Sequence, residues 1–488
     1  MNPVRRYALC VGLVLCVSAG VIAGTAYIPN MKPFRDPTGY LASYNAGGDI
    51  DESGPFFQSL GTNGRTCATC HQVDQAFSMS VQKIQQRFAM SHGQDPLFAP
   101  VDGANCPNGQ AGNAGDHSLL LNNGLIRVGL PMPPNAEFSL TVVHDPYGCA
   151  IMVDPNTGQE TVSVYRRPLP ATNLGFLSTV MFDGRETIMP LNNQQTFAAN
   201  LATDLTHQAT DAVLGHAQGQ HPPSDEQLAE IIKTELGFFT AQLSDNQAGQ
   251  LWVDGANGGP RYLSSQPYYP GVNDSLGGDP HGYKFNPNAM TIYTGWQQNQ
   301  GGDDGQDQAR AMIAAGEKLF NSAPLHITGV RGLNDNPALN NPPEIDGTCT
   351  TCHDTPNVGD HSFPLPLDIG TSHPLQFERD PRIAGGVREL SAPDLPVYLI
   401  TGCVDPQNPD RLLTFYTSDP GKGLISGRCA DVNRGKGPIL RGIAARAPYF
   451  HNGSAPDLQH LVNFYNERFS MDLTDQQKQQ LIAFLNSL

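Results

Sequence analysis

The sequence is poor in charged residues, and in basic ones above all. Only 15% of its 488 residues are charged, and 46 acidic residues outnumber 29 basic ones, which gives a net charge of −17. This balance argues against a nucleic-acid partner and favours simple solubility or a partner with a basic face. No repeat with a period of about 20 to 50 residues is present, which excludes a solenoid. Low-complexity tracts are also absent outside loops rich in Gly and Pro.

One long apolar run stands at the N-terminus. Arg5 and Arg6 precede apolar residues from Tyr7 to Gly24, and small residues follow, which is the pattern of an export signal. The run is close to the length of a short membrane span, so an uncleaved anchor is the alternative. We therefore expect residues 1–26 to be a signal peptide or N-terminal anchor and the rest of the chain to be periplasmic.

The length of the chain predicts two or three domains, since 488 residues exceed what one compact core usually holds. The 91 Gly and Pro residues indicate long ordered loops between helices. From Asp254 to Asp307 the chain is rich in Gly, Pro, Asn and Asp, which is typical of a linker or a long loop. We place the boundary there, between residues 27–290 and residues 291–488.

A five-residue pattern, C-x-x-C-H, occurs twice. It covers Cys67, Cys70 and His71 in "TCATCHQ", and it returns as Cys349, Cys352 and His353 in "TCTTCHD". With 10 Cys and 14 His in the chain, about 0.006 chance matches are expected. Covalent haem c accounts for every residue, because two thioethers fix the porphyrin and the adjacent histidine ligates iron. The sequence thus predicts two covalently bound haems c.

Two other readings of the pattern are weaker. A zinc site built from all four cysteines leaves both histidines unexplained and joins distant parts of the chain. A redox dithiol of the thioredoxin type needs a strand in front of it, and "GTNGRTCATC" offers no apolar strand. Cys106, Cys149, Cys403 and Cys429 lie outside the pattern, and in an exported protein they should be oxidised. Three pairings are open, of which we favour the two local ones, Cys106 with Cys149 and Cys403 with Cys429.

Amphipathic helices predict a mainly α fold with long loops and few short strands. "DQARAMIAAGEKLF" forms an apolar face before the second haem motif, and "PPSDEQLAEIIKTELGFFTAQL" does so in the N-terminal half, with Ser224 as its cap. Ser454 followed by Asp457, and Thr474 followed by Gln477, resemble capping boxes. We expect them to start the last two helices, whose apolar stripes contain Leu458, Val462, Tyr465, Leu481 and Leu485.

The stretch from Leu440, "LRGIAARAPYFHNGSAPDLQHLVNFYNERF", is the most specific further motif. Together with "FDGR" at residues 182–185 and the order of the haem motifs, it resembles the superfamily of bacterial di-haem cytochrome c peroxidases and MauG. The resemblance implies two cytochrome c-like haem domains. In that family the N-terminal haem reacts with hydrogen peroxide, the C-terminal haem stores or relays electrons, and a calcium ion often sits between the domains.

The resemblance also implies a distal pocket at the first haem. The family has Gln-Ala, with a carboxylate ten residues after the Gln; here Gln208 and Ala209 match, but Gln218 replaces the carboxylate. Because an amide donates no acidic proton, His216 is our candidate acid/base group, against the alternative of a surface histidine. Phe182 stands where the family commonly has a Trp that helps connect the haems, and its alternative role is core packing.

At the second haem, the family uses either Met or Tyr as the sixth iron ligand. Tyr465 lies in the matching helix and is our candidate ligand, with a buried core tyrosine as the alternative. Met471 is the next candidate. A phenolate favours ferric and higher iron, whereas a thioether favours ferrous iron.

We therefore predict a di-haem peroxidase that reduces hydrogen peroxide to water. The expected route passes through a ferryl intermediate at the His71 haem, and the His353 haem shares or relays oxidising equivalents. Expected partners are hydrogen peroxide and a small electron-donor protein, either a cytochrome c or a cupredoxin. The alternatives are MauG-like oxidation of a partner protein, a plain electron-transfer cytochrome, and a di-haem oxygenase acting on an organic polymer.

Overall fold

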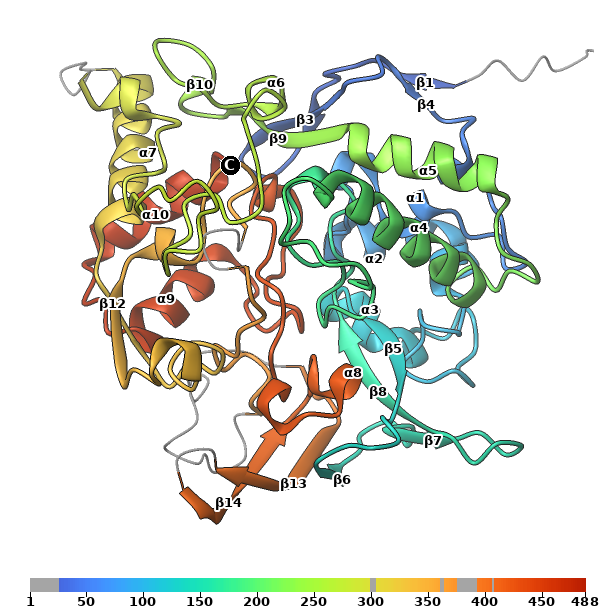
Figure 1. The fold of residues 1–488 in the computed structure, drawn as a ribbon. Coiled ribbons are helices and arrows are strands. Elements are labelled where there is room, and N and C mark those ends of the chain that lie inside the picture. Colours follow the sequence, from blue (N-terminus) through green and yellow to red (C-terminus); the bar gives the residue numbers. More distant parts are fainter. Residues whose placement is uncertain (1–25, 299–303, 360–363, 375–392, 406–407) are drawn as a thin grey trace, which may run out of the picture.

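A computed structural model describes residues 26–298, 304–359, 364–374, 393–405 and 408–488. The predicted signal or anchor at residues 1–26 therefore lies almost wholly outside the described residues. Figure 1 shows two halves side by side, with helices α1 to α5 in one and α7, α9 and α10 in the other. In the described part of the chain, no helix is long and apolar enough to cross a membrane.

The helices begin where local capping predicts. Ser224 accepts a hydrogen bond from the Gln227 amide at the start of α5, and Thr474 does the same for Gln477 at the start of α10. The α-helices are α1 (Cys67–Cys70), α2 (Val81–Ser91), α3 (Ser118–Asn123), α4 (Phe197–Gly215), α5 (Asp225–Gly237), α6 (Pro260–Leu263), α7 (Gly305–Ser322), α8 (Gly423–Ser426), α9 (Leu458–Arg468) and α10 (Asp475–Asn486).

The capping box predicted at Ser454 is wrong. Helix α9 begins at Leu458, and its cap is Asp457, whose carboxylate accepts the His460 amide at 2.9 Å. The Ser454 hydroxyl is buried and has no hydrogen-bond partner among the residues that the structure describes. An aspartate directly before the first helical residue is a strong N-cap by itself, so the helix starts one turn later than the pattern suggested.

The expectation of a mainly α fold with few short strands holds only in part: the structure is 31% helix and 19% strand, with several small sheets, and is not plainly mainly α. Several strands are long, and all pairs are antiparallel. The strands are β1 (Tyr27–Ile28), β2 (Phe34–Arg35), β3 (Gly39–Asn45), β4 (Ile50–Asp51), β5 (Ile126–Pro131), β6 (Ser139–His144), β7 (Ile151–Val153), β8 (Glu160–Arg166), β9 (Phe238–Asp245), β10 (Gly249–Gln250), β11 (Leu325–Thr328), β12 (Glu344–Gly347), β13 (Val397–Asp405) and β14 (Asn408–Thr417).

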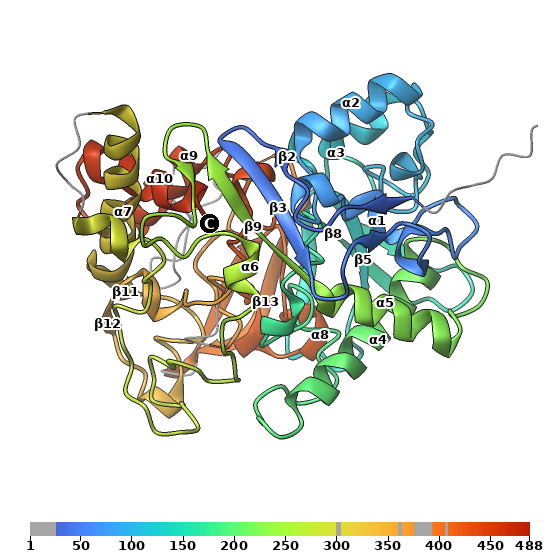
Figure 2. The same ribbon diagram turned by 90° about the horizontal axis from the view of Figure 1, so that it is seen from above.

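A three-stranded sheet joins the two halves of the chain. Its order is β14-β13-β6, and Tyr398 of β13 pairs with Val142 of β6. Figure 1 shows this sheet below the helical halves, and Figure 2 shows the long pair β3 and β9 running across the other side. Strand pairing therefore holds the two haem-motif regions at a fixed separation.

Both predicted disulfides are formed. Cys106 joins Cys149, and Cys403 joins Cys429, with Cα–Cα distances of 6.0 and 5.5 Å. The four cysteines of the haem motifs take part in neither disulfide. Oxidised structural cysteines fit a protein that folds outside the reducing cytosol.

Each half has its own apolar core. One core contains Phe56, Phe77, Leu205, Ile231 and Phe238 and lies around the first motif. The other packs α7 against α10 and includes Phe320, Phe484 and Leu485 around the second motif. Residues 248–296 contribute Leu251, Tyr293 and Trp296 to this second core. The predicted boundary at residue 290 stays a prediction.

Candidate functional site

The two C-x-x-C-H stretches fold into the same local turn. In the first, the Thr66 amide donates to Thr69 Oγ1 at 2.9 Å and the His71 amide donates to the Cys67 carbonyl at 3.0 Å. In the second, the corresponding bonds join Thr348 to Thr351 at 2.9 Å and His353 to Cys349 at 2.9 Å. A short sequence thus fixes both cysteines and the histidine relative to one another before any tertiary contact is made.

The motif histidines are held as neutral imidazoles. Burial lowers the pKa of His71, and it lowers the pKa of His353 to about 4. His71 Nδ1 lies 3.1 Å from the Phe77 carbonyl, so Nδ1 carries the hydrogen and Nε2 is left with its lone pair. A neutral imidazole with one oriented nitrogen is the form that ligates iron.

The thiols do not suit the two weaker readings of the motif. Burial raises the pKa of Cys67 to about 12 and that of Cys70 to about 11, whereas a redox dithiol needs a lowered pKa. Cys67 and Cys70 line one cavity, while Cys349 and Cys352 line another. A single four-cysteine zinc site is therefore excluded by position.

Each motif opens into a largely apolar cavity, and the residues present fit a haem. The first cavity is walled by Leu174, Leu177, Val180 and Leu205, and the second by Phe320, Ile327, Val330, Leu461 and Leu485. Two buried guanidinium groups, those of Arg167 and Arg446, line the second cavity and pair with no carboxylate among the described residues. Apolar walls, cysteines outside any disulfide, a neutral histidine and cations without counter-charge are what a porphyrin with two carboxylates requires.

Helix α4 brings two of the predicted distal residues to the first cavity. Gln208 lies on the helix face that lines the cavity, and His216 follows at the end of the helix. The side chain of His216 is 40% exposed, and its Nδ1 hydrogen-bonds to the buried Asp102 carboxylate, which also pairs with Arg65. Burial alone would raise the pKa of Asp102, but the hydrogen bond and charge of His216 and the charge of Arg65 lower it.

Gln218, the third predicted distal residue, does not line the cavity. The helix ends at Gly215, and the chain turns at Gln218, whose φ is +54°. Its side chain is exposed and accepts a hydrogen bond from Asn63 Nδ2 at 3.2 Å. The structure therefore does not bring Gln218 together with Gln208 and His216 at the cavity, because the turn directs its amide away.

Glu235 is a cavity residue that sequence reasoning missed. It projects from α5 into the wall of the first cavity, is 5% exposed, and leaves Oε2 without a hydrogen-bond partner. Burial raises the pKa of Glu235 to about 8. The only available signal was a glutamate on the apolar side of "DEQLAEIIKTELG", four residues after Ile231. At neutral pH this side chain carries a proton next to Cys67.

Phe182 lies between the two cavities and lines both. Its ring stacks on His451 of the "APYFHNGS" stretch, with centroids 4.5 Å apart and an interplanar angle of 15°. Arg166 lies over the same ring at 4.9 Å and is paired with Asp183 and Asp419. The residue at the family's Trp position therefore contacts both haem cavities, although it is not an indole.

The second cavity contains both candidate iron ligands. Tyr465 on α9 and Met471 just beyond it line the wall that also includes Cys349, Cys352 and His353. Burial raises the pKa of Tyr465, and the nearby thiols of Cys352 and Cys349 add to the effect. No hydrogen bond of the Tyr465 hydroxyl is formed within the described residues, so the buried-core alternative lacks the partner that a buried phenol usually has.

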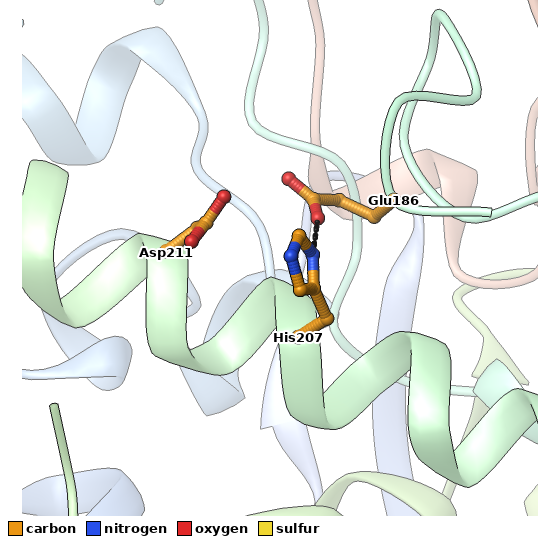
Figure 3. Close-up of side chains that lie close together, drawn as sticks. All are labelled: Glu186, His207 and Asp211. Atoms are coloured by element: carbon orange, nitrogen blue, oxygen red, sulfur yellow. Dashed lines mark hydrogen bonds and ion pairs between the residues drawn. The ribbon is translucent and has the colours of Figure 1, made fainter. Parts of the chain in front are cut away.

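A third cluster lies outside both cavities. Glu186, His207 and Asp211 have ligand atoms within 4.8 Å of one another, and Figure 3 shows His207 bonded to Glu186 with Asp211 one turn further along α4. Glu186 also pairs with Arg185, so its carboxylate is already neutralised. Glu186 is buried, whereas His207 and Asp211 are exposed. The calcium ion between the domains stays a prediction.

Comparisons with known proteins indicate the class of protein. The family model of RoxA-like, cytochrome c-like proteins matches residues 436–471, which include "APYFHNGS" and Tyr465. Cytochrome-c peroxidase IdrP2 of Denitromonas iodatirespirans is 29% identical over 149 residues, and cytochrome-c peroxidase IdrP1 of Pseudomonas sp. (strain SCT) is 29% identical over 163 residues. Each match covers 29% of this chain and about a third, 36%, of the relative.

A solved MauG-like protein associated with microbial copper homeostasis also matches, at 14% identity and a TM-score of 0.29, over 70% of this chain and 79% of the other. The low TM-score means that no argument rests on this neighbour. The peroxidase relatives, the cytochrome c-like match and the paired motifs support one class, the superfamily of di-haem cytochrome c peroxidases and MauG.

Proposed function

We propose that this protein is a periplasmic di-haem peroxidase that reduces hydrogen peroxide to water at the haem held by Cys67, Cys70 and His71. The haem held by Cys349, Cys352 and His353 exchanges electrons with it. The relatives named cytochrome-c peroxidase support the reaction class, and the two disulfides support an exported protein.

The observation that carries the assignment of roles is an asymmetry between the cavities. The first cavity contains groups that hold and move protons, namely the His216–Asp102 pair, the Glu235 carboxyl and the Gln208 amide. The second contains two side chains that can close an iron position, Tyr465 and Met471. Peroxide reduction consumes two protons, so the cavity with proton donors is the one suited to the chemistry.

In the first cavity, bound haem supplies the iron that binds peroxide and passes electrons. Gln208 can hydrogen-bond a peroxide oxygen through its amide. His216 Nε2 is free of the Asp102 contact and is the atom that takes and returns a proton, while Asp102 fixes the ring through Nδ1. Glu235 holds a further proton inside the apolar wall, out of contact with bulk water.

Two smaller proposals complete the picture. Tyr465 would hold the iron of the second haem together with His353, and Phe182 with His451 is the proposed contact between the haem cavities. The electron source is a small redox protein, a cytochrome c or a cupredoxin, that docks against an acidic protein of net charge −17.

The test begins with the mass of the denatured protein after production with a haem-attachment system. Two added haem masses are expected, and none would end the proposal. Peroxide turnover with a small reductant is then compared between wild type, His216→Ala and His221→Ala. The first variant should lose about 10²-fold or more in the peroxide step. The second removes an exposed histidine a few residues away and should not.

The same measurements separate the alternatives. A plain electron carrier has two six-coordinate irons, so a ferric spectrum without a high-spin haem and no turnover would favour it. A MauG-like enzyme would consume peroxide only while oxidising side chains of a partner protein. An unchanged peroxide rate in His216→Ala would leave Glu235 or water as the proton donor.

A further inference from the structure

Two neighbouring arginines in the chain have opposite electrostatic surroundings. Arg166 is paired with the carboxylates of Asp183 and Asp419. Arg167 is equally buried, yet none of its hydrogen bonds goes to a carboxylate. The fold thus supplies two counter-charges to one guanidinium and none to the next.

All acceptors around Arg167 are main-chain carbonyls. Its guanidinium donates to the carbonyls of Met79, of Asn123 at 3.1 Å and of Arg446 at 3.0 Å. Gly124, with φ +65°, lies so close to Nη1 that no side chain fits there. These backbone carbonyl groups hold the Arg167 guanidinium in one position.

Arg446 repeats the pattern beside it. It donates to the carbonyls of Ile439 and of Arg441, the latter at 3.2 Å, and its Nε has no partner among the described residues. Burial, reinforced by the charge of Arg446, lowers the pKa of Arg167 to about 9, and burial lowers the pKa of Arg446 to about 10. A buried cation without an anion costs several kcal/mol, so this region has a surplus positive charge that a bound anion would stabilise.

The position of the pair identifies the anion. Arg446 lines the second cavity, and Arg167 lines both cavities. The cavities are otherwise largely apolar, and each is the place where a motif would attach a porphyrin that carries two carboxylates. Guanidinium groups bind carboxylates through charge-assisted hydrogen bonds, and each of the two arginines keeps N–H groups that donate to no carbonyl of the described residues: Nε in Arg167, and Nε and Nη1 in Arg446.

We propose that Arg167 and Arg446 form a carboxylate-binding site that takes the carboxylate groups of the haems, with Arg167 shared between both haems and Arg446 serving the His353 haem alone. The proposal rests on the haem-binding part of the proposed function and not on peroxide turnover. Because one cation interacts with carboxylates of both haems, a change of charge at one haem alters the electrostatic potential at the other. Arg167 therefore couples the two reduction potentials.

The sign of the effect follows from charge. A cation beside a haem carboxylate offsets its negative charge and so destabilises ferric iron relative to ferrous iron. Loss of the cation therefore lowers the reduction potential of every haem that it serves. Arg446→Gln should lower one potential, that of the His353 haem, whereas Arg167→Gln should lower both.

The experiment is a spectroelectrochemical titration of the holoprotein. Denatured mass first establishes that each variant carries both haems, which separates a failure of this proposal from a failure of haem attachment. A Cys349→Ala/Cys352→Ala variant assigns each potential to its haem. Arg35→Gln, which removes an exposed arginine far along the chain from both motifs, is the control and should shift neither potential. Arg167→Lys keeps the charge, so it should stay near wild type even if Arg167→Gln fails to fold.

Four results would overturn the proposal. Unchanged potentials in Arg167→Gln with both haems present would remove Arg167 from the site. A shift of only one haem would remove its shared role, and a large shift in Arg167→Lys would point to packing and not to charge. If added acetate shifts the wild-type potentials, and Arg167→Gln matches wild type in acetate-free buffer, the anion is a free carboxylate and the assignment to haem is wrong.

Discussion

At the scale of single residues, Glu235 has the most unusual surroundings in the first cavity. Its neighbours in the core around α5 are apolar side chains such as Ile231, Ile232 and Phe238, and no cation pairs with it in the part of the chain that the structure describes. Burial without a counter-charge keeps the acid neutral, which explains why its pKa is raised. A neutral carboxylic acid beside a haem site can hold a proton where water does not reach.

This environment predicts how stability depends on pH. The folded pKa of Glu235 is about 8 and the ordinary value is 4.5, so its contribution is fully present below about pH 4.5 and is lost as pH rises through about 8. At about 1.4 kcal/mol per pKa unit, the loss is on the order of several kcal/mol. Glu235→Gln, which cannot ionise, should flatten this part of the profile.

Urea denaturation at a series of pH values between about 5 and 9 measures this profile. Glu230→Gln changes an exposed glutamate of the same helix, and its profile should follow wild type. If Glu235→Gln loses stability with pH as steeply as wild type does, Glu235 is ionised in the folded protein and is not a proton-holding group.

Tyr465 carries the second residue-scale prediction. Replacing it with Phe should open one iron position and change the ferric spectrum of the His353 haem, because a phenyl ring cannot ligate iron. Replacing it with Met should raise the potential of that haem, since a thioether favours ferrous iron. Spectra and potentials of the His71 haem should stay nearly the same. A wild-type spectrum in Tyr465→Phe, combined with a changed one in Met471→Leu, would make Met471 the ligand.

At the scale of secondary structure, local signals predicted helices well and strands poorly. The helix at residues 305–322 follows from its apolar spacing, and the starts at Asp225 and Asp475 follow from their caps. No strand was predicted at Val397–Asp405 or Asn408–Thr417, yet these residues form the long pair β13 and β14. Strand β6, which pairs with β13, lies more than 250 residues earlier in the chain. The local sequence therefore does not indicate this pairing.

In the candidate site, too, residues placed by local sequence were predictable and residues placed by the tertiary fold were not. The cysteines and histidines of the motifs were predictable, because their geometry is set within a few residues. Gln208 and His216 reach the cavity because one helix carries both. Asp102 and Glu235 could not be predicted as cavity residues, because both are far from His71 in the sequence. Nothing in the sequence near them indicates that the fold brings them to the cavity.

The corrected start of α9 gives an element-scale prediction. Asp457→Ala removes the acceptor for the His460 amide and should cost about 1 kcal/mol. Ser454→Ala removes a buried hydroxyl without a partner and should be close to neutral. Thr474→Ala, at the cap of α10, serves as a positive control of similar size to Asp457→Ala. Urea midpoints decide the matter, and a larger loss in Ser454→Ala than in Asp457→Ala would restore the capping box read from the sequence.

At the scale of the whole molecule, strand β13 ties the two halves into one unit. Tyr398 on this strand is fully buried, and its hydroxyl lies 3.0 Å from the Ala150 carbonyl and 2.6 Å from the Ser163 carbonyl. Both acceptors belong to the N-terminal half, whereas Tyr398 belongs to the C-terminal half. The phenol is therefore a polar contact inside an apolar cluster that contains Leu130, Val162 and Val164.

Tyr398→Phe should destabilise both halves together. The change keeps the ring but removes the donor from two buried carbonyl groups, at a cost of about 1–3 kcal/mol. Trp252 and Trp296 both belong to the segment that packs with the C-terminal core, so their fluorescence reports that half, while far-ultraviolet circular dichroism reports the whole chain. We expect the urea midpoints of both signals to fall by the same amount.

The control is Leu412→Ala on the neighbouring strand β14, which changes a side chain that is 63% exposed. It should leave the free energy of unfolding from both signals within about 0.5 kcal/mol of wild type. If only the circular dichroism midpoint falls, the halves unfold separately, and the sheet between them does not couple the stability of the two haem sites.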